Sequence, residues 1–413
     1  MPLSHRPPRF WLQGGHPSPL RLDDLHGRNP LPLLSRNASA RSEPGHHHSP
    51  DGKYHIKNFL QYLIDSIQIK DSLISMKPQT DDWYRPPIPR KELKQFMQRS
   101  DAEGLANFAL WFASLCASGL LAYKARRSFW AIPAFLLYGT IYSSCDARWH
   151  ECAHGTPFRT HWLNEFFYRL SSLMNMREGT YMRWSHTRHH TETIQIGLDP
   201  EIQVMRPANL TNVVLDFLWL PGSFAMLKTM TLHALGILTK EARDFVPESE
   251  QRPMMWWSRL YMMIYLSMAA WSIAARSWLP VLFFPLGRMY GGWLHQLLAL
   301  TQHSGLAEDV RDHRLNTRTL KLNPFFRFLY FNMNYHIEHH MFPMVPFHAL
   351  PKLHERVKKD LPRPYNGLVD AYKEIVPALI RQSRDADYFL VRELPGQGPS
   401  EAKSRPSTEI KTQ

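Results

Sequence analysis

Three dense histidine clusters contain the side chains of this chain that are best suited to chemistry. Their sequences are His-Glu-Cys-Ala-His at 150–154, His-Thr-Arg-His-His at 186–190 and His-Ile-Glu-His-His at 336–340. Imidazole is a common metal ligand near neutral pH, and histidines three or four positions apart share one face of a helix. Eight convergent imidazoles exceed the four ligands that one zinc ion takes. The clusters therefore predict two metal ions in nitrogen-rich shells, and imidazole suits iron when the chemistry is redox.

A ninth histidine is expected to join these clusters. Arg288, His295 and Gln302 recur every seven residues in an apolar stretch, so on a helix they form one polar stripe that faces a protein interior. This stripe directs the next residue, His303, towards the metal side. The predicted metal ligands are His150, His154, His186, His189, His190, His303, His336, His339 and His340.

Four long apolar runs could bring the clusters together. They cover 105–123, 129–145, 255–275 and 278–300, and the first, which carries no charge, is just long enough to cross a hydrocarbon core as a helix. Arg288 near the middle of the fourth run would cost roughly 2.5–3.5 kcal/mol against lipid, so it is expected to face the bundle interior. We predict an all-α membrane protein with four transmembrane helices in two hairpins, which place all the clusters on one membrane face.

The region 209–238 is expected to pack on the protein or lie at a membrane interface. Its apolar halves are broken by Pro221 and Gly222 and carry Asp216 and Lys228. Neither half is long enough to span a membrane. A span here would also place the third cluster on the opposite side from the first two.

Composition divides the rest of the chain into segments. Residues 1–53 are rich in Pro, Arg, His and Ser without apolar periodicity, so we expect a disordered extension. Residues 54–100 form a predicted cytosolic amphipathic lead-in, and 101–350 the membrane domain. A cytosolic helical cap is expected to carry the histidine clusters, with residues 351–394 forming the cap over the site and 395–413 a disordered tail.

Charge and cysteine content limit the possible partners. The net charge of +13 favours anionic lipid headgroups or an acidic protein. Binding of nucleic acid is not expected, because the sequence contains no recognisable nucleic-acid-binding motif. Three cysteines are too few for a disulfide framework or a four-cysteine iron–sulfur cluster. The chain contains no haem-carrier domain or nucleotide-binding glycine loop, so electrons must come from a separate protein.

The positions of Lys and Arg favour a cytosolic location for the clusters. Cations are more frequent at 85–99 and 148–169, on the cluster side, than in the opposite loops. The positive-inside rule then places the cluster side in the cytosol. The loop at 124–127, with three cations, argues the other way.

The three clusters together resemble those of the membrane fatty-acid desaturase and hydroxylase superfamily, over roughly 80–390. The resemblance implies that the nine histidines bind two irons at the cytosolic ends of a four-span bundle, in the endoplasmic reticulum or in a bacterial inner membrane. Asp199, Asn334 and Glu338 are then candidates to hydrogen-bond ligating imidazoles. The sequence of residues 302–314 resembles that of one branch of this superfamily, which includes rhizobitoxine-type desaturases.

A di-iron site of this kind predicts an oxidoreductase that uses dioxygen and external electrons to desaturate an acyl or alkyl chain. After a first hydrogen is removed from the chain, loss of a second hydrogen gives a double bond, whereas transfer of oxygen to the carbon gives an alcohol. Hydroxylation therefore remains an alternative. The substrate is expected to be a membrane lipid or acyl chain. The expected electron donor is a cytochrome b-type carrier or a ferredoxin, with its reductase.

Other functions fit the sequence less well. The first cluster also satisfies the zinc-protease pattern H-E-x-x-H, with Glu151 as general base. That reading leaves the six histidines of the other two clusters unexplained. Histidines with ordinary structural roles, or a membrane scaffold without activity, would not require three clusters at metal spacing.

Overall fold

The structure is a computed structural model that describes residues 82–395. Within this range all regular secondary structure is helical, with two isolated bridges, Thr319 with Tyr335 and Leu320 with Tyr365. The all-α class is therefore confirmed for the described residues. The predicted extension 1–53, part of the lead-in and nearly all of the predicted tail lie outside them.

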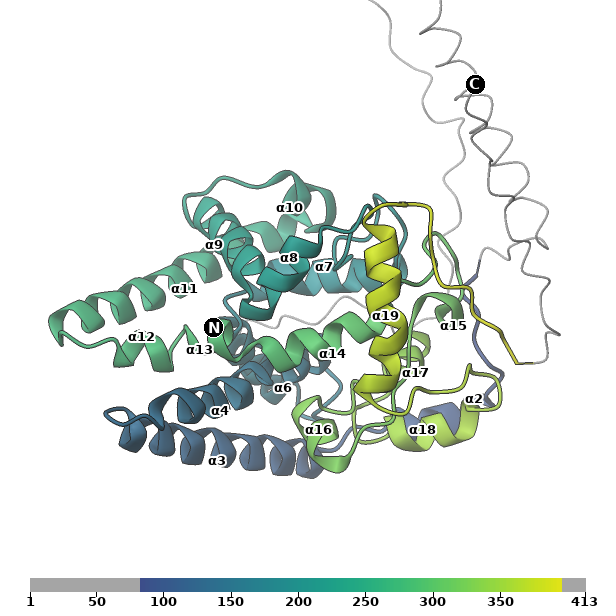
Figure 1. Cartoon of the computed structure of the whole chain (residues 1–413), viewed down its shortest axis with the longest axis horizontal. Coiled ribbons are helices and arrows are strands. Elements are labelled where there is room, and N and C mark those ends of the chain that lie inside the picture. Colours follow the sequence, from purple (N-terminus) through teal and green to yellow (C-terminus); the bar gives the residue numbers. More distant parts are fainter. Residues whose placement is uncertain (1–81, 396–413) are drawn as a thin grey trace, which may run out of the picture. The chain divides into compact units, whose positions relative to one another are not determined.

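Figure 1 shows the arrangement of the helices. In chain order they are α2 (Arg90–Phe96), α3 (Asp101–Ala125), α4 (Ala131–Ser143), α5 (Cys145–His154), α6 (His161–Met174), α7 (Gly179–Thr191), α8 (Leu210–Leu215), the 3-10 helix η3 (Asp216–Leu218), α9 (Leu220–Ala234), α10 (Lys240–Phe245), α11 (Glu248–Ala274), α12 (Leu279–Phe283), α13 (Gly287–Gly291), α14 (Trp293–His303), α15 (His313–Asn316), α16 (Pro324–Leu329), α17 (His336–Met341), α18 (Leu350–Val357) and α19 (Leu368–Gln382).

The first predicted hairpin is present as α3 and α4, which lie side by side (Figure 1). Ser100 begins α3, because its side chain accepts a hydrogen bond from the Glu103 N–H at 3.3 Å and caps the free amides of the first turn. Among the described residues, the continuous stretch Arg90–Ala125 is the one long and apolar enough to cross a membrane alone. The second run forms only the 13 residues of α4 before the chain turns into α5.

The second predicted hairpin differs from the expectation in its second half. The run 255–275 lies in one helix, α11, as predicted. The single helix expected over 278–300 is wrong, because that run divides into α12, α13 and α14. Pro285 lies at the first break, where it cannot donate a helical hydrogen bond, and Gly292 lies at the second. Four membrane spans are thus not established by helix length.

Close backbone contact joins the two hairpins. A Cβ atom placed on Gly291 of α13 would lie 1.9 Å from the carbonyl carbon of Gly139 on α4. Only glycine fits at such a crossing. Tyr138 adds a hydrogen bond from its hydroxyl to the Phe283 carbonyl at 3.0 Å. The crossing brings the start of α14 towards α5 and the first histidine cluster.

The region 209–238 forms the interrupted pair that the sequence predicts. The stretches Leu210–Leu218 and Leu220–Ala234 meet at an angle of 76° around Trp219. The pair passes the length and hydropathy criteria for one membrane span only if both halves are counted together. It packs on α11, where the guanidinium Nε of Arg259 donates to the Ala234 carbonyl at 2.8 Å.

The C-terminal helices hold the third cluster against the bundle. Ile337 and Met341 of α17 pack with Leu353 of α18 and with apolar residues of α2. Helix α19 crosses α14 (Figure 1), and the Tyr372 hydroxyl donates to the Leu297 carbonyl at 2.9 Å. Within the predicted cap, 351–394, the chain forms nearly all of α18 and all of α19, and these helices pack against α17 and α14.

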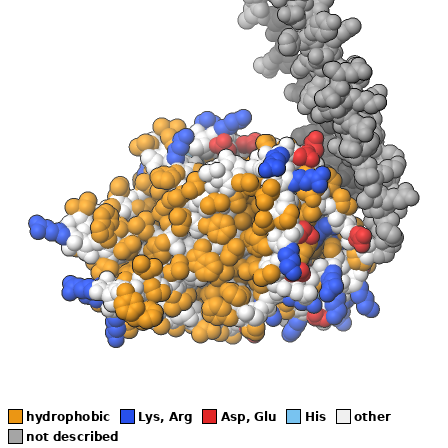
Figure 2. Space-filling view, viewed as in Figure 1, with side chains coloured by type: hydrophobic (Ala, Val, Ile, Leu, Met, Phe, Trp, Pro, Cys, Tyr) orange, Lys and Arg blue, Asp and Glu red, His pale blue; other side chains and the backbone are white. Residues whose placement is uncertain are grey.

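A broad apolar surface covers the side of the molecule drawn in Figure 2. Large hydrophobic side chains on α3 and α11 are exposed, including Phe112, Leu120, Trp271 and Ile273. Exposed apolar surface of this extent marks an interaction with lipid or with another protein. Basic side chains gather beyond it, at the ends of the two hairpins (Figure 2).

Candidate metal centre

The nine histidines meet in one buried cluster built by four helices. Helices α5 and α7 supply the first two clusters, the last residue of α14 supplies His303, and α17 supplies the third cluster. Six of the nine side chains are buried, and His150, His154 and His303 are partly exposed. Residues separated by up to 190 positions thus share one site, as the two-hairpin prediction required.

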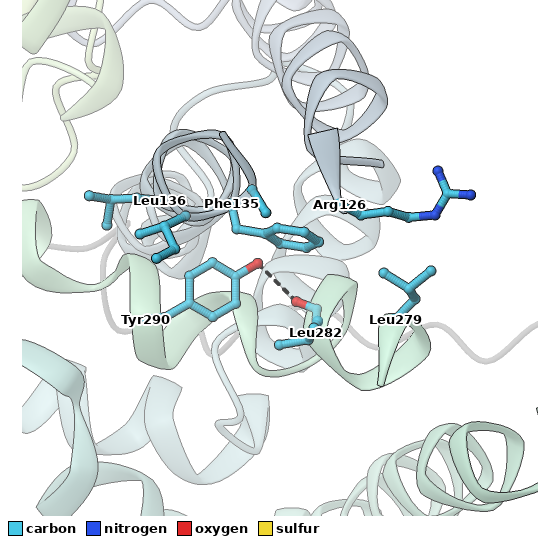
Figure 3. Close-up of a pocket in the computed structure, with 8 residues that line it drawn as sticks. Arg126, Phe135, Leu136, Leu279, Leu282 and Tyr290 are labelled. Atoms are coloured by element: carbon cyan, nitrogen blue, oxygen red, sulfur yellow. Dashed lines mark hydrogen bonds between the residues drawn. The ribbon is translucent and has the colours of Figure 1, made fainter. Parts of the chain in front are cut away.

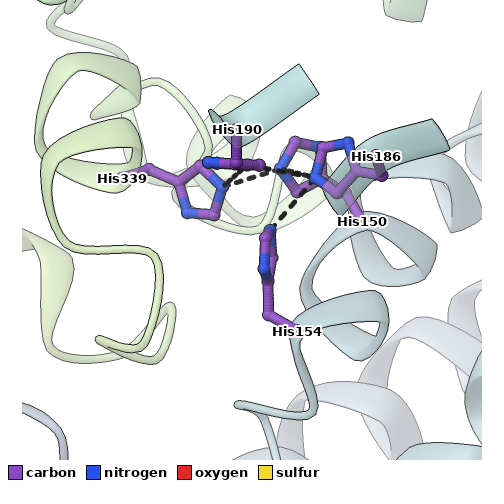
Figure 4. A group of neighbouring side chains, drawn as sticks. All are labelled: His150, His154, His186, His190 and His339. Carbon is purple, nitrogen blue, oxygen red and sulfur yellow. Dashed lines mark hydrogen bonds between the residues drawn. The ribbon is translucent and has the colours of Figure 1, made fainter. Parts of the chain in front are cut away.

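Five of the histidines form a first group, shown in Figure 4. One ring nitrogen from each lies within 4.8 Å of the corresponding atom of every other member. The Nε2 atoms of His150 and His339 are 2.8 Å apart, and those of His154 and His186 are 3.0 Å apart. The members of this five-histidine group are His150, His154, His186, His190 and His339.

The other four histidines form a second group beside the first. His189, His303 and His340 each offer one nitrogen within 4.8 Å of the others. His336 joins them, because its Nε2 atom lies 3.2 Å from Nε2 of His303 and 3.1 Å from Nε2 of His340. Each of the two groups, of five and four imidazoles, could hold a metal ion.

The Nδ1 partners of these rings identify which nitrogen faces the metal. His186 Nδ1 lies 2.9 Å from Glu201, His189 Nδ1 lies 2.8 Å from Asp199, and His303 Nδ1 lies 2.9 Å from the Asn316 carbonyl. A ring that donates its Nδ1 proton to an oxygen carries its lone pair on Nε2.

The Nε2 lone pairs of His186 and His303 therefore face the Nε2 atoms of His154 and His336, at 3.0 and 3.2 Å. This donor set fits metal cations.

Burial keeps most of the imidazoles in the neutral form that binds metal. It lowers the pKa of His150, His154 and His190 well below the usual range, and neighbouring imidazoles add to the effect. Burial also lowers the pKa of His186, although Glu201 opposes the shift. At neutral pH these rings need lose no proton to coordinate a metal ion.

His189 differs from its neighbours because of its carboxylate partner. Burial opposes its charged form, but the attraction and hydrogen bond of Asp199 outweigh it, so the pKa of His189 is raised. The pKa of Asp199 is correspondingly lowered: burial raises it, but His189 and two backbone N–H groups together more than reverse that shift. Asp199 also accepts hydrogen bonds from the backbone N–H groups of Ile194 and Glu201, both at 2.8 Å, which fixes its orientation.

Two of the three residues expected beside the ligands lie elsewhere. Asp199 contacts His189 as expected, but Glu338 accepts a hydrogen bond from the Thr319 hydroxyl at 2.6 Å and pairs with His354. Asn334 donates to the Leu320 carbonyl at 2.8 Å. The expected contact of Glu338 and Asn334 with ligating imidazoles is therefore wrong. Glu338 projects away from the helix face that its neighbouring histidines share, because successive helical residues are about 100° apart.

Two carboxylates that contact candidate ligands were not expected from the sequence. Glu201 bonds His186 and also accepts from the Ser185 hydroxyl at 2.7 Å. Glu151 lies 3.4 Å from Nδ1 of His339. The usable signal for Glu201 was its position two residues after Asp199, in the segment that follows the second cluster.

The surroundings of Glu151 disfavour the zinc-protease alternative. This carboxylate is fully buried, and it accepts hydrogen bonds from the Thr156 hydroxyl at 2.7 Å and the Phe347 N–H at 3.2 Å. A general base in such a protease must face a water molecule on the metal. Glu151 instead ties α5 to the segment after the third cluster.

Sequence comparison agrees with this geometry. The profile of the Fatty acid desaturase family matches residues 127–372, which include all nine histidines and more than half of the chain. The chain therefore belongs to the fatty acid desaturase family, a family of oxidoreductases. A Delta(5) fatty acid desaturase, fat-4 of Caenorhabditis elegans, is 22% identical over 272 residues, covering 58% of this chain and 60% of that protein. The chain thus matches less than two thirds of the length of this curated relative.

Replacing Asp199 with asparagine is expected to weaken metal binding by about 10–100-fold, the usual effect of losing a hydrogen-bond partner of a ligand. The amide keeps the size of the side chain but loses the charge that orients and polarises His189. The measurement is the metal retained by the purified protein at graded chelator concentrations. Asp244→Asn is the control, because it removes an exposed carboxylate whose ion pair, with Arg188 at 3.6 Å, involves no candidate ligand, and it should retain metal as the unmodified protein does. Equal retention in both variants would contradict this role of Asp199.

Proposed function

We propose that this protein is an integral-membrane, non-haem di-iron oxidoreductase that uses dioxygen and external electrons to desaturate an acyl or alkyl chain. The observation that carries this proposal is the pair of groups of five and four imidazoles in a chain of the fatty acid desaturase family. The Delta(5) fatty acid desaturase named above supports desaturation as the reaction and an acyl chain as the substrate class.

Iron bound to these groups would supply the activation of dioxygen and the removal of hydrogen from an unactivated C–H bond. The protein's own residues hold the ligands ready for it. Asp199 and Glu201 fix the orientation of His189 and His186 through their Nδ1 atoms. The Asn316 carbonyl does the same for His303. Burial of the cluster also excludes bulk water, which limits loss of oxidising equivalents to solvent.

The proposed membrane arrangement has two hairpins, α3 with α4 and α11 with α12–α14. The exposed apolar side chains of α3 and α11 support insertion in lipid. The buried charge of Arg288, predicted to avoid lipid, supports the inward orientation of the fourth run, because it pairs with Asp146 at 2.7 Å. By the positive-inside rule the metal centre would face the cytosol, in the endoplasmic reticulum or a bacterial inner membrane.

Product analysis tests the reaction itself. The full-length protein is expressed in cells with and without Asp199→Asn, and cellular lipids are examined by mass spectrometry. Desaturation predicts acyl chains lighter by two hydrogens, whereas hydroxylation, the second candidate, predicts chains heavier by one oxygen. Lipids unchanged in both respects, from cells that contain iron-loaded protein, would contradict an acyl-chain oxidase of either kind.

Metal analysis of the purified protein is expected to give about two irons per chain, because the two histidine groups offer separate sets of ligands. One zinc per chain would instead support the protease alternative. Glu151→Gln separates the two further. It should abolish a protease but only weaken iron binding, since Glu151 contacts His339 at 3.4 Å and is not itself a proposed ligand.

The proposed electron donor is an acidic carrier, a cytochrome b-type protein or a ferredoxin, supplied by its own reductase. The net charge of +13 supports this complementarity. Initial rates in a reconstituted system are expected to fall as salt rises from about 0.01 to 0.15 M, where the Debye length shortens from about 30 to 8 Å. Rates independent of salt would contradict electrostatic docking of the donor.

A further inference from the structure

An apolar cavity of about 480 Å³ lies at the ends of α4 and α12, where no predicted chemistry takes place. Its walls include Ala131, Phe135, Leu136 and Leu279, and its rim includes Arg126 (Figure 3). The Tyr290 hydroxyl in the wall is already used, since it donates to the Leu282 carbonyl at 2.9 Å. The cavity therefore offers a hydrocarbon-like interior with one cation at its edge.

The helix crossing described above separates this cavity from the metal centre. The walls from α4 are residues before Gly139, whereas residues after it, such as Thr140 and Ser144, line a different cavity of only about 10 Å³. Between them the backbones of Gly139 and Gly291 leave no room even for a Cβ atom. A molecule in the larger cavity is therefore outside the path to the histidines.

The surroundings of the cavity are suited to a lipid headgroup. Residues 124–136 and 275–287 contain four cations, Lys124, Arg126, Arg127 and Arg276, and no Asp or Glu. The Arg126 side chain donates to the Tyr123 carbonyl at 2.6 Å and stacks on that ring, but it forms no ion pair with any described carboxylate. The exposed aromatic residues Trp130 and Trp278 flank this end, as aromatic side chains do at a membrane–water boundary.

We propose that this cavity binds one anionic glycerophospholipid, with its phosphate at Arg126 and one acyl chain along Phe135, Leu136 and Leu279. The proposal rests on the membrane insertion included in the proposed function, but not on the reaction. It also gives a reason for the cations at 124–127, which the positive-inside rule disfavours on the side away from the cytosol. A bound phosphate would neutralise part of that charge.

The test is native mass spectrometry of the full-length protein in neutral detergent with added phosphatidylglycerol or phosphatidylcholine. We expect one phosphatidylglycerol per chain at concentrations where phosphatidylcholine is not retained. Arg126→Gln should weaken phosphatidylglycerol binding by about fivefold, the factor that corresponds to about 1 kcal/mol for one cation near a lipid surface. Ala131→Phe, which fills the cavity, should weaken the binding of both lipids. Arg127→Gln removes the same charge from an exposed neighbour outside the cavity and should have little effect.

Three results would overturn the proposal. These are equal retention of the two lipids, unchanged binding in the Ala131→Phe variant, or a free fatty acid in place of a phospholipid among the molecules extracted from the purified protein. Iron content and product formation, measured on the same samples, distinguish this failure from failure of the proposed function. If the lipid does not bind but iron and product are present, only the proposal for this cavity fails. If the lipid binds but no product forms, only the proposed function of the metal centre fails.

Discussion

Replacing His339 with alanine is expected to abolish turnover and to remove the metal of the five-histidine group. The Nε2 atom of His339 lies 2.8 Å from that of His150 and 3.2 Å from that of His190, so its ring belongs to the centre of this group. Loss of a direct ligand should exceed the 10–100-fold loss expected for a residue that only supports a ligand. We therefore expect activity to fall by more than about 100-fold and iron to fall from about two to about one per chain.

The corresponding change in the second group is His189→Ala. It should remove the other iron, because His189 shares its group with His303 and His340 and not with His339. The double variant should contain almost no iron. His161→Ala is the matched control, since His161 is an exposed histidine at the start of α6. Unchanged turnover in either single variant would contradict a di-iron centre built from both groups.

The position of the site could be predicted because its information is local. Within each cluster the helical spacing alone places the imidazoles on one face, and the stripe of Arg288, His295 and Gln302 is a helical periodicity of the same kind. The structure shows these three residues turned inward: Arg288 and His295 lie 2.7 and 3.3 Å from Asp146, and Gln302 donates to the Tyr330 hydroxyl at 2.7 Å.

The partners of the ligands could not be predicted because they depend on contacts between distant helices. Glu151 reaches the Phe347 N–H nearly 200 positions later in the chain, and no local pattern encodes that distance. The expectation for Glu338 failed for a different reason, since nearness in sequence to a ligand does not place a side chain on the ligand's face of a helix.

The continuous fourth helix was a wrong prediction because average hydropathy does not register helix breaks. Pro280 and Pro285 are apolar and leave the average of 278–300 high, although Pro285 ends helical hydrogen bonding between α12 and α13. The two glycines at 291 and 292 are similarly unremarkable in a hydropathy scale. The role of Gly291 becomes clear only with Gly139, its partner at the helix crossing.

The contact between Asp146 and Arg288 is expected to be the electrostatic contact on which the stability of this bundle depends most. The Asp146 carboxylate accepts from Arg177 at 3.1 Å and from Arg288 at 2.7 Å, and the Arg288 side chain is only 1% exposed. Asp146→Asn would leave this guanidinium charged, buried and without an anion. Breaking a buried pair in this way typically costs about 3–5 kcal/mol of unfolding free energy. The measurement is denaturant-induced unfolding of the purified protein in detergent, followed by tryptophan fluorescence.

A second substitution tests the cause of that loss. Arg288→Met in the Asp146→Asn background removes the unpaired cation and should recover part of the lost stability, because a buried pair replaced by apolar groups is often neutral. Glu355→Gln, which removes an exposed partner of Lys358, is the control and should not change unfolding measurably. If Asp146→Asn unfolded like the unmodified protein, the buried network would not be a source of stability. Asp146 lies one helical turn before His150, so loss of the network should also lower iron content in parallel with stability.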